Sequence, residues 1–179
     1  ELSLSLSPGD LLMVARKHID TLLLDYPVST YRSRGYYALG WCLWELGEYP
    51  LSLDAFTQAA VGLEKSMEHA ECLFKQADVQ LKLGQADSAL TLYKTLLTEY
   101  QNYDDVRVQL FEQALYQMLR AAIDAEVLED AEWAAQRIIH SYPNGPLSQR
   151  SRLLLGQRLI HLDQISEARD RFLKLIEQF

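Results

Sequence analysis

The chain has 179 residues, 49% of them hydrophobic, and a formal net charge of −8 because 25 acidic residues outnumber 17 basic ones. Affinity for nucleic acid is built largely from cationic contacts to phosphates, so this charge balance argues against a nucleic-acid partner. The longest apolar runs are far too short to span a bilayer. Two cysteines are too few for a disulfide framework, and sparse glycine and proline predict long regular elements joined by short turns.

Apolar residues recur at helical spacing along almost the whole chain, often on more than one helical face, as helices packed between neighbours require. Residues 2–7 alternate leucine with serine, a period that on its own would suit a strand. The register of the helices that follow favours instead a frayed helical or coil end. The pattern then predicts about nine helices, over residues 10–25, 30–46, 49–63, 67–83, 86–100, 104–125, 128–141, 146–161 and 164–178.

The ends of these helices carry turn signals. Gly47 follows the second predicted helix and indicates its end, because glycine readily adopts the left-handed conformation of a helix terminus. Pro50 opens the next helix, where a missing amide donor costs little. Tyr-Pro pairs at residues 26–27 and 142–143 end two other helices, since a residue before proline avoids the helical region.

Three columns of residues repeat along the chain. The first holds small side chains at successive spacings of 37, 37, 42 and 37 residues: Ala15, Ser52, Ala89, Ala131 and Ala168. Four residues further on in each copy stand Ile19, Phe56, Tyr93, Ala135 and Phe172. Eleven residues further on stand Tyr26, Leu63, Tyr100, Tyr142 and Phe179. Self-similarity at such a period indicates stacked helical hairpins, each stabilised by the next.

The single spacing of 42 comes from five extra residues, which fall around residues 100–105. They predict either a longer loop or a longer following helix. Insertions in repeat proteins often mark a contact surface, although plain tolerance of an insertion explains them equally well.

The repeat resembles the tetratricopeptide repeat, whose signature runs aromatic, Leu-Gly, aromatic or Leu, Gly, Tyr, Ala, Phe, Ala and then Pro. The copy over residues 30–64 matches best, with Tyr36, Leu39, Gly40, Leu43, Gly47, Tyr49, Ser52, Phe56 and Ala59. The fourth hairpin keeps Leu155, Gly156, Leu159, Ala168 and Phe172. The second keeps Gly84, Ala89 and Tyr93 but has Gln76 and Ala77 for Leu-Gly. The third departs most, with Met118, Leu119, Ala131 and Ala135.

The resemblance implies an all-α, right-handed superhelix of helical hairpins. It predicts a single solenoid over residues 1–179, with four full hairpins after a partial N-terminal repeat. The copies fall at about residues 1–27, 30–64, 67–101, 104–143 and 146–179. Because both ends fall within a repeat, we expect a piece of a longer array whose first and last helices expose apolar faces.

A 37-residue period with helices ending in Tyr-Pro resembles repeats of bacterial envelope proteins, among them outer-membrane assembly lipoproteins and the TolA-binding periplasmic protein. This likeness predicts a periplasmic or envelope-associated location, with the cytoplasm as the alternative.

In this family the first helix of each hairpin lines a concave groove. Matching positions give a candidate binding set of Arg34, Tyr37, Trp41, Trp44, Glu71, Phe74, Asp78, Gln113, Tyr116, Arg120, Arg150, Leu153 and Gln157. Aromatic residues flanked by arginines suit recognition of an extended or helical peptide. The alternative is that Trp41, Trp44 and Phe74 simply pack between helices. The set lacks the paired lysines and asparagines by which chaperone-tail-binding members hold a carboxylate terminus.

The residue types that metal binding or catalysis would require are scattered along the sequence. His69 and Cys72 lie three apart, but one such pair falls short of a metal site. Acidic pairs at residues 104–105 and 129–130 fall at predicted helix starts, where carboxylates favour the positive end of the helix dipole. No glycine-rich phosphate loop or nucleophile elbow is present. We therefore expect no catalytic residue, metal or cofactor.

The sequence thus predicts a non-catalytic scaffold that binds a protein or peptide. Two alternatives stay open: the helical arm of a larger envelope or glycan-processing enzyme, and a module that self-assembles through its end helices into a homo-oligomer.

Overall fold

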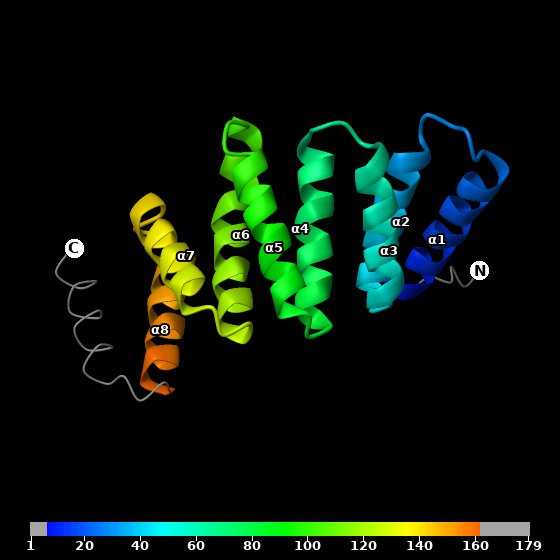
Figure 1. The fold of residues 1–179 in the computed structure, drawn as a ribbon. Coiled ribbons are helices and arrows are strands. Elements are labelled where there is room, and N and C mark those ends of the chain that lie inside the picture. Colours follow the sequence, from blue (N-terminus) through cyan, green and yellow to red (C-terminus); the bar gives the residue numbers. More distant parts are fainter. Residues whose placement is uncertain (1–6, 162–179) are drawn as a thin grey trace. The chain divides into compact units, whose positions relative to one another are not determined.

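A computed structural model describes residues 7–161 of the chain, and every regular element in that range is an α-helix. The eight helices, labelled in Figure 1, are α1 (Pro8–Asp25), α2 (Arg32–Glu45), α3 (Tyr49–Gly62), α4 (Met67–Lys82), α5 (Ala86–Glu99), α6 (Asp104–Asp124), α7 (Leu128–Ser141) and α8 (Pro146–His161). Each begins and ends within two residues of its predicted bounds, so the all-α prediction is confirmed. The ninth predicted helix, over residues 164–178, and the alternating residues 2–6 lie outside the described range.

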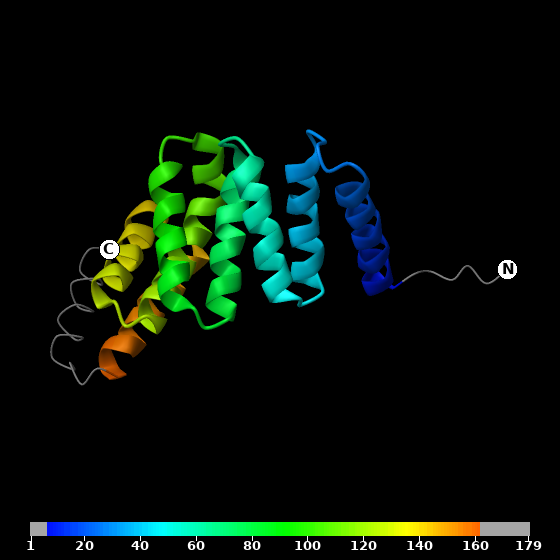
Figure 2. The same cartoon turned by 45° about the vertical axis from the view of Figure 1, so that its right-hand side comes forward.

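The chain divides into two compact units, residues 1–85 and residues 86–179, each considered by itself. In the first, α1 packs on α2, α2 on α3 and α3 on α4. In the second, α5 packs on α6, α6 on α7, and α8 on both α6 and α7. Figure 2 shows the same helices from another side, with sequence neighbours adjacent within each unit. A single continuous solenoid over the whole chain stays a prediction.

The core of the first unit is built around Phe56. Its side chain is completely buried, together with Ala59 and Cys72. A Cβ atom added at Gly40 would lie 2.7 Å from the ring of Phe56, so only glycine fits on α2 at this point. The backbone carbonyl of Gly40 also accepts a hydrogen bond of 2.9 Å from the buried hydroxyl of Ser52. This close approach sets the distance between α2 and α3.

In the third hairpin, the large and the small side chain at this contact are exchanged between the two helices. The repeat places Leu119 at the position of Gly40, and Ala135 at the position of Phe56. Both side chains are completely buried. The third hairpin thus has its large residue on the first helix and its small residue on the second. The first hairpin has its small residue, Gly40, on the first helix and its large residue, Phe56, on the second. Cores tolerate such exchanges when the total volume is conserved.

The five inserted residues lengthen a helix. Helix α6 begins 27 residues before Ala131, whereas α4 begins 22 residues before Ala89. Of the two predicted outcomes, a longer loop or a longer helix, the structure shows the second, and the extra residues extend α6 at its N-terminal end. At 21 residues, α6 is longer than α2 or α4, with 14 and 16.

The turns inside three hairpins use a left-handed residue at the same point of the repeat. Gly47 and Gly84 both have φ of 75°. In the third hairpin this position is taken by Glu126, with φ of 61°. A residue with a side chain is strained in this conformation by about 1–2 kcal/mol, because its Cβ approaches the following carbonyl oxygen.

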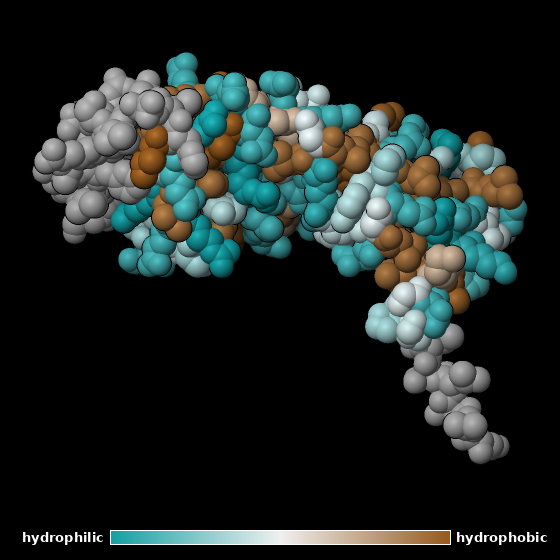
Figure 3. Space-filling model, turned by 90° about the horizontal axis from the view of Figure 1, so that it is seen from below, coloured by the Kyte–Doolittle hydropathy of each residue, from teal (hydrophilic) through white to brown (hydrophobic). Residues whose placement is uncertain are grey.

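Helix α1 is covered on fewer sides than the others. It has no buried residue, although it packs on α2. Figure 3 shows apolar side chains at the surface beside the start of the described chain. The exposed apolar residues of this helix are Leu11, Met13, Val14 and Leu24.

We predict that Gly40→Ala destabilises the chain by up to about 2 kcal/mol in urea denaturation. Alanine favours a helix by about 1 kcal/mol over glycine, but overpacking a buried site costs about 1–3 kcal/mol. Gly9→Ala is the matched control, since a Cβ atom there meets only the hydroxyl of Ser7, at 3.8 Å. Equal stability of the two variants would contradict the proposed contact with Phe56, and adding Phe56→Leu should restore part of the loss.

We also predict that Glu126→Gly raises the stability by about 1 kcal/mol, because glycine adopts the left-handed conformation without steric strain. The substitution removes an exposed contact of 3.4 Å to Arg158, which is worth little. Gly47→Ala should lower the stability by a similar amount. Thermal unfolding checks both signs, and a lower melting temperature for Glu126→Gly would rule the explanation out.

Candidate functional site

The first helices of the first unit, α2 and α4, join through several candidate binding residues. The guanidinium of Arg34 lies 3.0 Å from the carboxylate of Glu68. The hydroxyl of Tyr37 donates a hydrogen bond to Glu71. Burial is the largest cause that raises the pKa of Tyr37, followed by this bond to the carboxylate. The three candidates Arg34, Tyr37 and Glu71 are therefore engaged in contacts between these two helices.

Lys75 occupies a cage of aromatic rings on the same face. Its ammonium lies 4.2 Å from the ring centre of Trp44, 4.8 Å from that of Trp41 and 5.4 Å from that of Phe74. It also lies 3.0 Å from the carboxylate of Asp78, and the two side chains are only 12% and 5% exposed. Cation–π contacts of this kind contribute about 0.5–2 kcal/mol each. The cage is thus filled from within the chain.

These contacts reduce the surface that the first-unit candidates offer to a partner. Phe74 and Asp78 are buried, and Trp41 and Trp44 are half-buried beneath the side chain of Lys75. The packing alternative therefore describes the position of Phe74, and it accounts for much of the surface of the two tryptophans. Lys75 was not a candidate in the sequence. Its signal was a lysine directly after Phe74 and three residues before an aspartate.

In the second unit the first-helix face is formed by α6 and α8, which pack on each other. Five of its six candidates are exposed: Gln113, Arg120, Arg150, Leu153 and Gln157. Tyr116 is half-buried between them and the core. Arg120 donates a hydrogen bond of 2.9 Å to the amide oxygen of Gln117 on its own helix. This face therefore keeps aromatic, cationic and apolar groups within reach of a partner.

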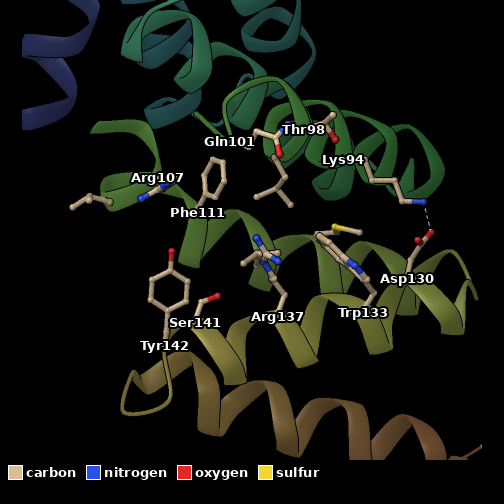
Figure 4. A pocket seen from close by; sticks show the side chains of 14 residues that line it. Lys94, Thr98, Gln101, Arg107, Phe111, Asp130, Trp133, Arg137, Ser141 and Tyr142 are labelled. Carbon is tan, nitrogen blue, oxygen red and sulfur yellow. Dashed lines mark hydrogen bonds and ion pairs between the residues drawn. The ribbon is translucent and has the colours of Figure 1, made fainter. Parts of the chain in front are cut away.

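A hollow lies on the other side of the second unit, between α5 and α7, with α6 as its floor (Figure 4). We call it the second-helix groove. Its volume is about 900 Å³, within the range of about 300–1,000 Å³ typical of ligand sites. It is lined by Lys94, Leu97, Thr98, Gln101, Arg107, Val108, Phe111, Leu115, Met118, Asp130, Trp133, Arg137, Ser141 and Tyr142.

Charged groups lie along the walls of this groove. Lys94 on α5 pairs with Asp130 on α7 at 2.5 Å, which ties the two walls together. Arg107 lies 3.4 Å from Asp104 on its own helix. Burial and the charge of Glu112 raise the pKa of Tyr142, while Arg107 and Arg137 act in the opposite direction. No site was predicted here from the sequence, because the lining comes from three helices and mixes polar with apolar residues.

Other groups that could support chemistry are separated or buried. Cys42 and Cys72 are free and buried, and burial raises the pKa of Cys72 to about 12, so its thiol stays neutral. Across residues 7–161, no three His, Cys, Asp or Glu side chains come together as a metal site would require. None of the helices in that range has the length and apolar character needed to cross a bilayer.

Helical hairpins that stack side by side and leave polar and aromatic side chains exposed define the class of repeat scaffolds. Similarities to known proteins agree with this class. The sequence model of the family "Tetratricopeptide repeat" matches residues 71–103. None of the curated proteins is significantly similar in sequence to the chain.

Several solved structures share the fold. That of MamA has a TM-score of 0.71 at 15% identity, with 97% of this chain and 95% of that chain covered. A tetratricopeptide repeat protein from Parabacteroides merdae ATCC 43184 has a TM-score of 0.72 at 22% identity, and the match covers 95% of this chain and 60% of that one. The TPR-like repeats of a putative kinesin light chain from Podosopora anserina have a TM-score of 0.71 at 12% identity, covering 93% and 86%.

Residues 71–103 thus match a tetratricopeptide repeat, and the chain shares its fold with solved tetratricopeptide-repeat structures. Solenoids of this family generally mediate protein–protein interaction and are typically non-catalytic scaffolds. At these identities the likeness concerns the fold, and the binding surface has to be argued from the residues of this chain.

Proposed function

We propose that the chain is a non-catalytic scaffold that binds a protein or peptide through the first-helix face of its second unit. The observation that carries this proposal is the contrast between the two units. In the first unit, Arg34 and Tyr37 contact α4 and the tryptophans hold Lys75. In the second unit, five of the six candidates on α6 and α8 are exposed, and Tyr116 is half-buried.

The composition of this exposed face suits recognition of a peptide. Leu153 is 60% exposed and stands on α8 with Arg150, one turn away. Tyr116 and Arg120 stand one turn apart on α6. Tyrosine and arginine are enriched among the few residues that carry most of the energy of protein interfaces. An apolar side chain beside arginines would anchor a segment with a bulky residue and an acceptor group.

A bacterial envelope location belongs to the same proposal. It is supported by the 37-residue period and by the Tyr-Pro ends of the helices at residues 26–27 and 142–143. In that setting the scaffold would hold components of an envelope complex together, and fractionation of the native cell would test the location. The role of a helical arm in a larger enzyme is the alternative that the flanking sequence would decide.

Self-assembly is a second candidate function, favoured by one observation on α1. Met13 and Leu24 lie at the two ends of a shallow hollow of about 350 Å³ along this helix. Both side chains are more than half exposed. A second copy covering this side would remove apolar surface from water at both molecules.

For the first-helix face, we predict that the variant Arg120→Ala, Arg150→Ala, Leu153→Ala loses the partner. Crosslinking and pull-down of the protein from its native cell would identify the partner by mass spectrometry. The dissociation constant of the purified pair should then rise at least about tenfold in the variant, because truncating central interface residues costs about 1–2 kcal/mol or more.

The matched control is Arg32→Ala, Lys65→Ala, Val61→Ala, which also removes two cations and one exposed apolar side chain, but in the first unit. The control should bind as the unchanged chain does. Equal binding by the test variant, at equal helicity, would show that this face is not the binding surface.

For self-assembly, we predict that the chain forms dimers as its concentration rises, and that Met13→Ser, Leu24→Ser abolishes them. Replacing apolar by polar side chains removes the favourable burial. Sedimentation velocity measures the association. Val28→Ser, at an exposed site beyond the end of α1, is the control. A chain that stays monomeric at all concentrations would exclude this function.

A further inference from the structure

Besides the first-helix face, the second unit has the second-helix groove. We propose that it binds an acidic peptide segment of a partner protein, with a bulky apolar side chain on the floor of the groove and a carboxylate at Arg137. This inference rests on the proposed function only in that the chain is a protein-binding scaffold. The surface is a different one, formed by α5, α6 and α7 and not by α6 and α8.

The floor of the groove is apolar. Leu97, Leu115 and Met118 line it with little exposure of their own, so they form a firm base. Around them Trp133 is 48% exposed and Val108 is 81% exposed. Large apolar side chains gathered in one hollow and rimmed by polar groups are typical of interaction sites. Tryptophan in particular is enriched among residues that dominate binding energy.

The walls of the groove carry an excess of positive charge. Three basic residues line it, Lys94, Arg107 and Arg137, against one acidic residue, Asp130. Lys94 is neutralised by Asp130, and Arg107 lies near Asp104. Among the residues that the structure describes, no carboxylate forms an ion pair with Arg137. In a chain with a net charge of −8, this groove therefore offers an uncompensated guanidinium above an apolar floor.

The positions of Trp133 and Arg137 fit a peptide that binds with both chemistries at once. The two residues are one turn apart on α7, and in Figure 4 both project across the groove toward α5. Thr98, Gln101 and Ser141 add hydrogen-bonding groups along the rim. A segment lying along the groove can place an apolar side chain beside Trp133 and a carboxylate at Arg137. A carboxylate–arginine pair forms charge-assisted hydrogen bonds, which are stronger than neutral ones.

The inserted residues supply one end of the groove. Without the extension of α6 by five residues, the helix would begin after Val108, and neither Arg107 nor Val108 would stand on a helix at this place. Phe111 would then belong to the first turn. The insertion therefore adds a cation and apolar surface to the hollow. In this proposal the lengthened helix forms a contact surface, which is one of the two explanations of the insertion that the sequence left open.

The first experiment selects ligands from a phage-displayed library of random dodecapeptides on the full chain. We expect the selected peptides to combine aspartate or glutamate with a neighbouring leucine, phenylalanine or tryptophan. A fluorescein-labelled peptide with the consensus sequence is then titrated with the chain, and fluorescence anisotropy gives the dissociation constant. Arg137→Gln or Trp133→Ala should each weaken binding about tenfold, and added salt should weaken it further, because the ionic contact is partly exposed.

Two controls separate the groove from its surroundings and from the first-helix face. Gln136→Ala changes an exposed residue of α7 that does not line the groove. Arg120→Gln removes a cation from the first-helix face. Neither should alter the affinity for the labelled peptide. Conversely, Arg137→Gln should leave binding of the partner identified on the first-helix face unchanged, so either proposal can fail without the other.

Three results would overturn the inference. Selected peptides without an excess of carboxylates would contradict the role of Arg137. Equal weakening by Arg120→Gln and Arg137→Gln would place the peptide elsewhere or show a general charge effect. Concentration-dependent dimers that Arg137→Gln dissociates would make a second copy of the chain the occupant of the groove.

Discussion

The close approach of the Phe56 ring to the backbone at Gly40 is the contact on which the first unit depends. The ring lies edge-on to Trp41 and Tyr37, with centroid distances of 5.9 and 6.4 Å, and so fixes the direction in which both aromatic residues leave α2. Tyr37 then meets a carboxylate of α4, and Trp41 meets Lys75. A steric constraint inside one hairpin thus determines the polar contacts to the next helix.

The same chain of contacts explains why the two units differ as binding surfaces. In the first unit, side chains of the type that recognise peptides stabilise the packing of α2 on its neighbours. In the second unit the inner packing uses Leu119 and Ala135, and polar and aromatic side chains remain exposed on two sides. The lengthened α6 takes part in both surfaces, since it carries Arg120 on one and Phe111 on the other.

The sequence predicted the described helices to within two residues, because hydrophobic period, glycine turns and Tyr-Pro ends are local signals. The candidate surface was harder to predict. Whether Phe74 faces solvent or the core depends on the rotation of α4 against α2, which no local pattern records. The cage around Lys75 is formed by long side chains from two helices, and the second-helix groove is lined by side chains from three helices. A local pattern in the sequence does not show which helices come together. In the sequence, a local signal for the groove was Trp133, an apolar residue with the polar residues Glu129, Asp130, Gln136 and Arg137 at helical spacing around it.

The exchange of Gly40 and Phe56 for Leu119 and Ala135 also bears on how such an array can evolve. A repeat duplicated or recombined as a whole hairpin carries its matched pair with it and packs at once. Recombination inside a hairpin would unite Leu119 with a phenylalanine, or Gly40 with an alanine, producing an overfilled or an empty interior. A change of side-chain size on one helix of a hairpin therefore requires a compensating change on the other helix, which exchange of an intact hairpin avoids.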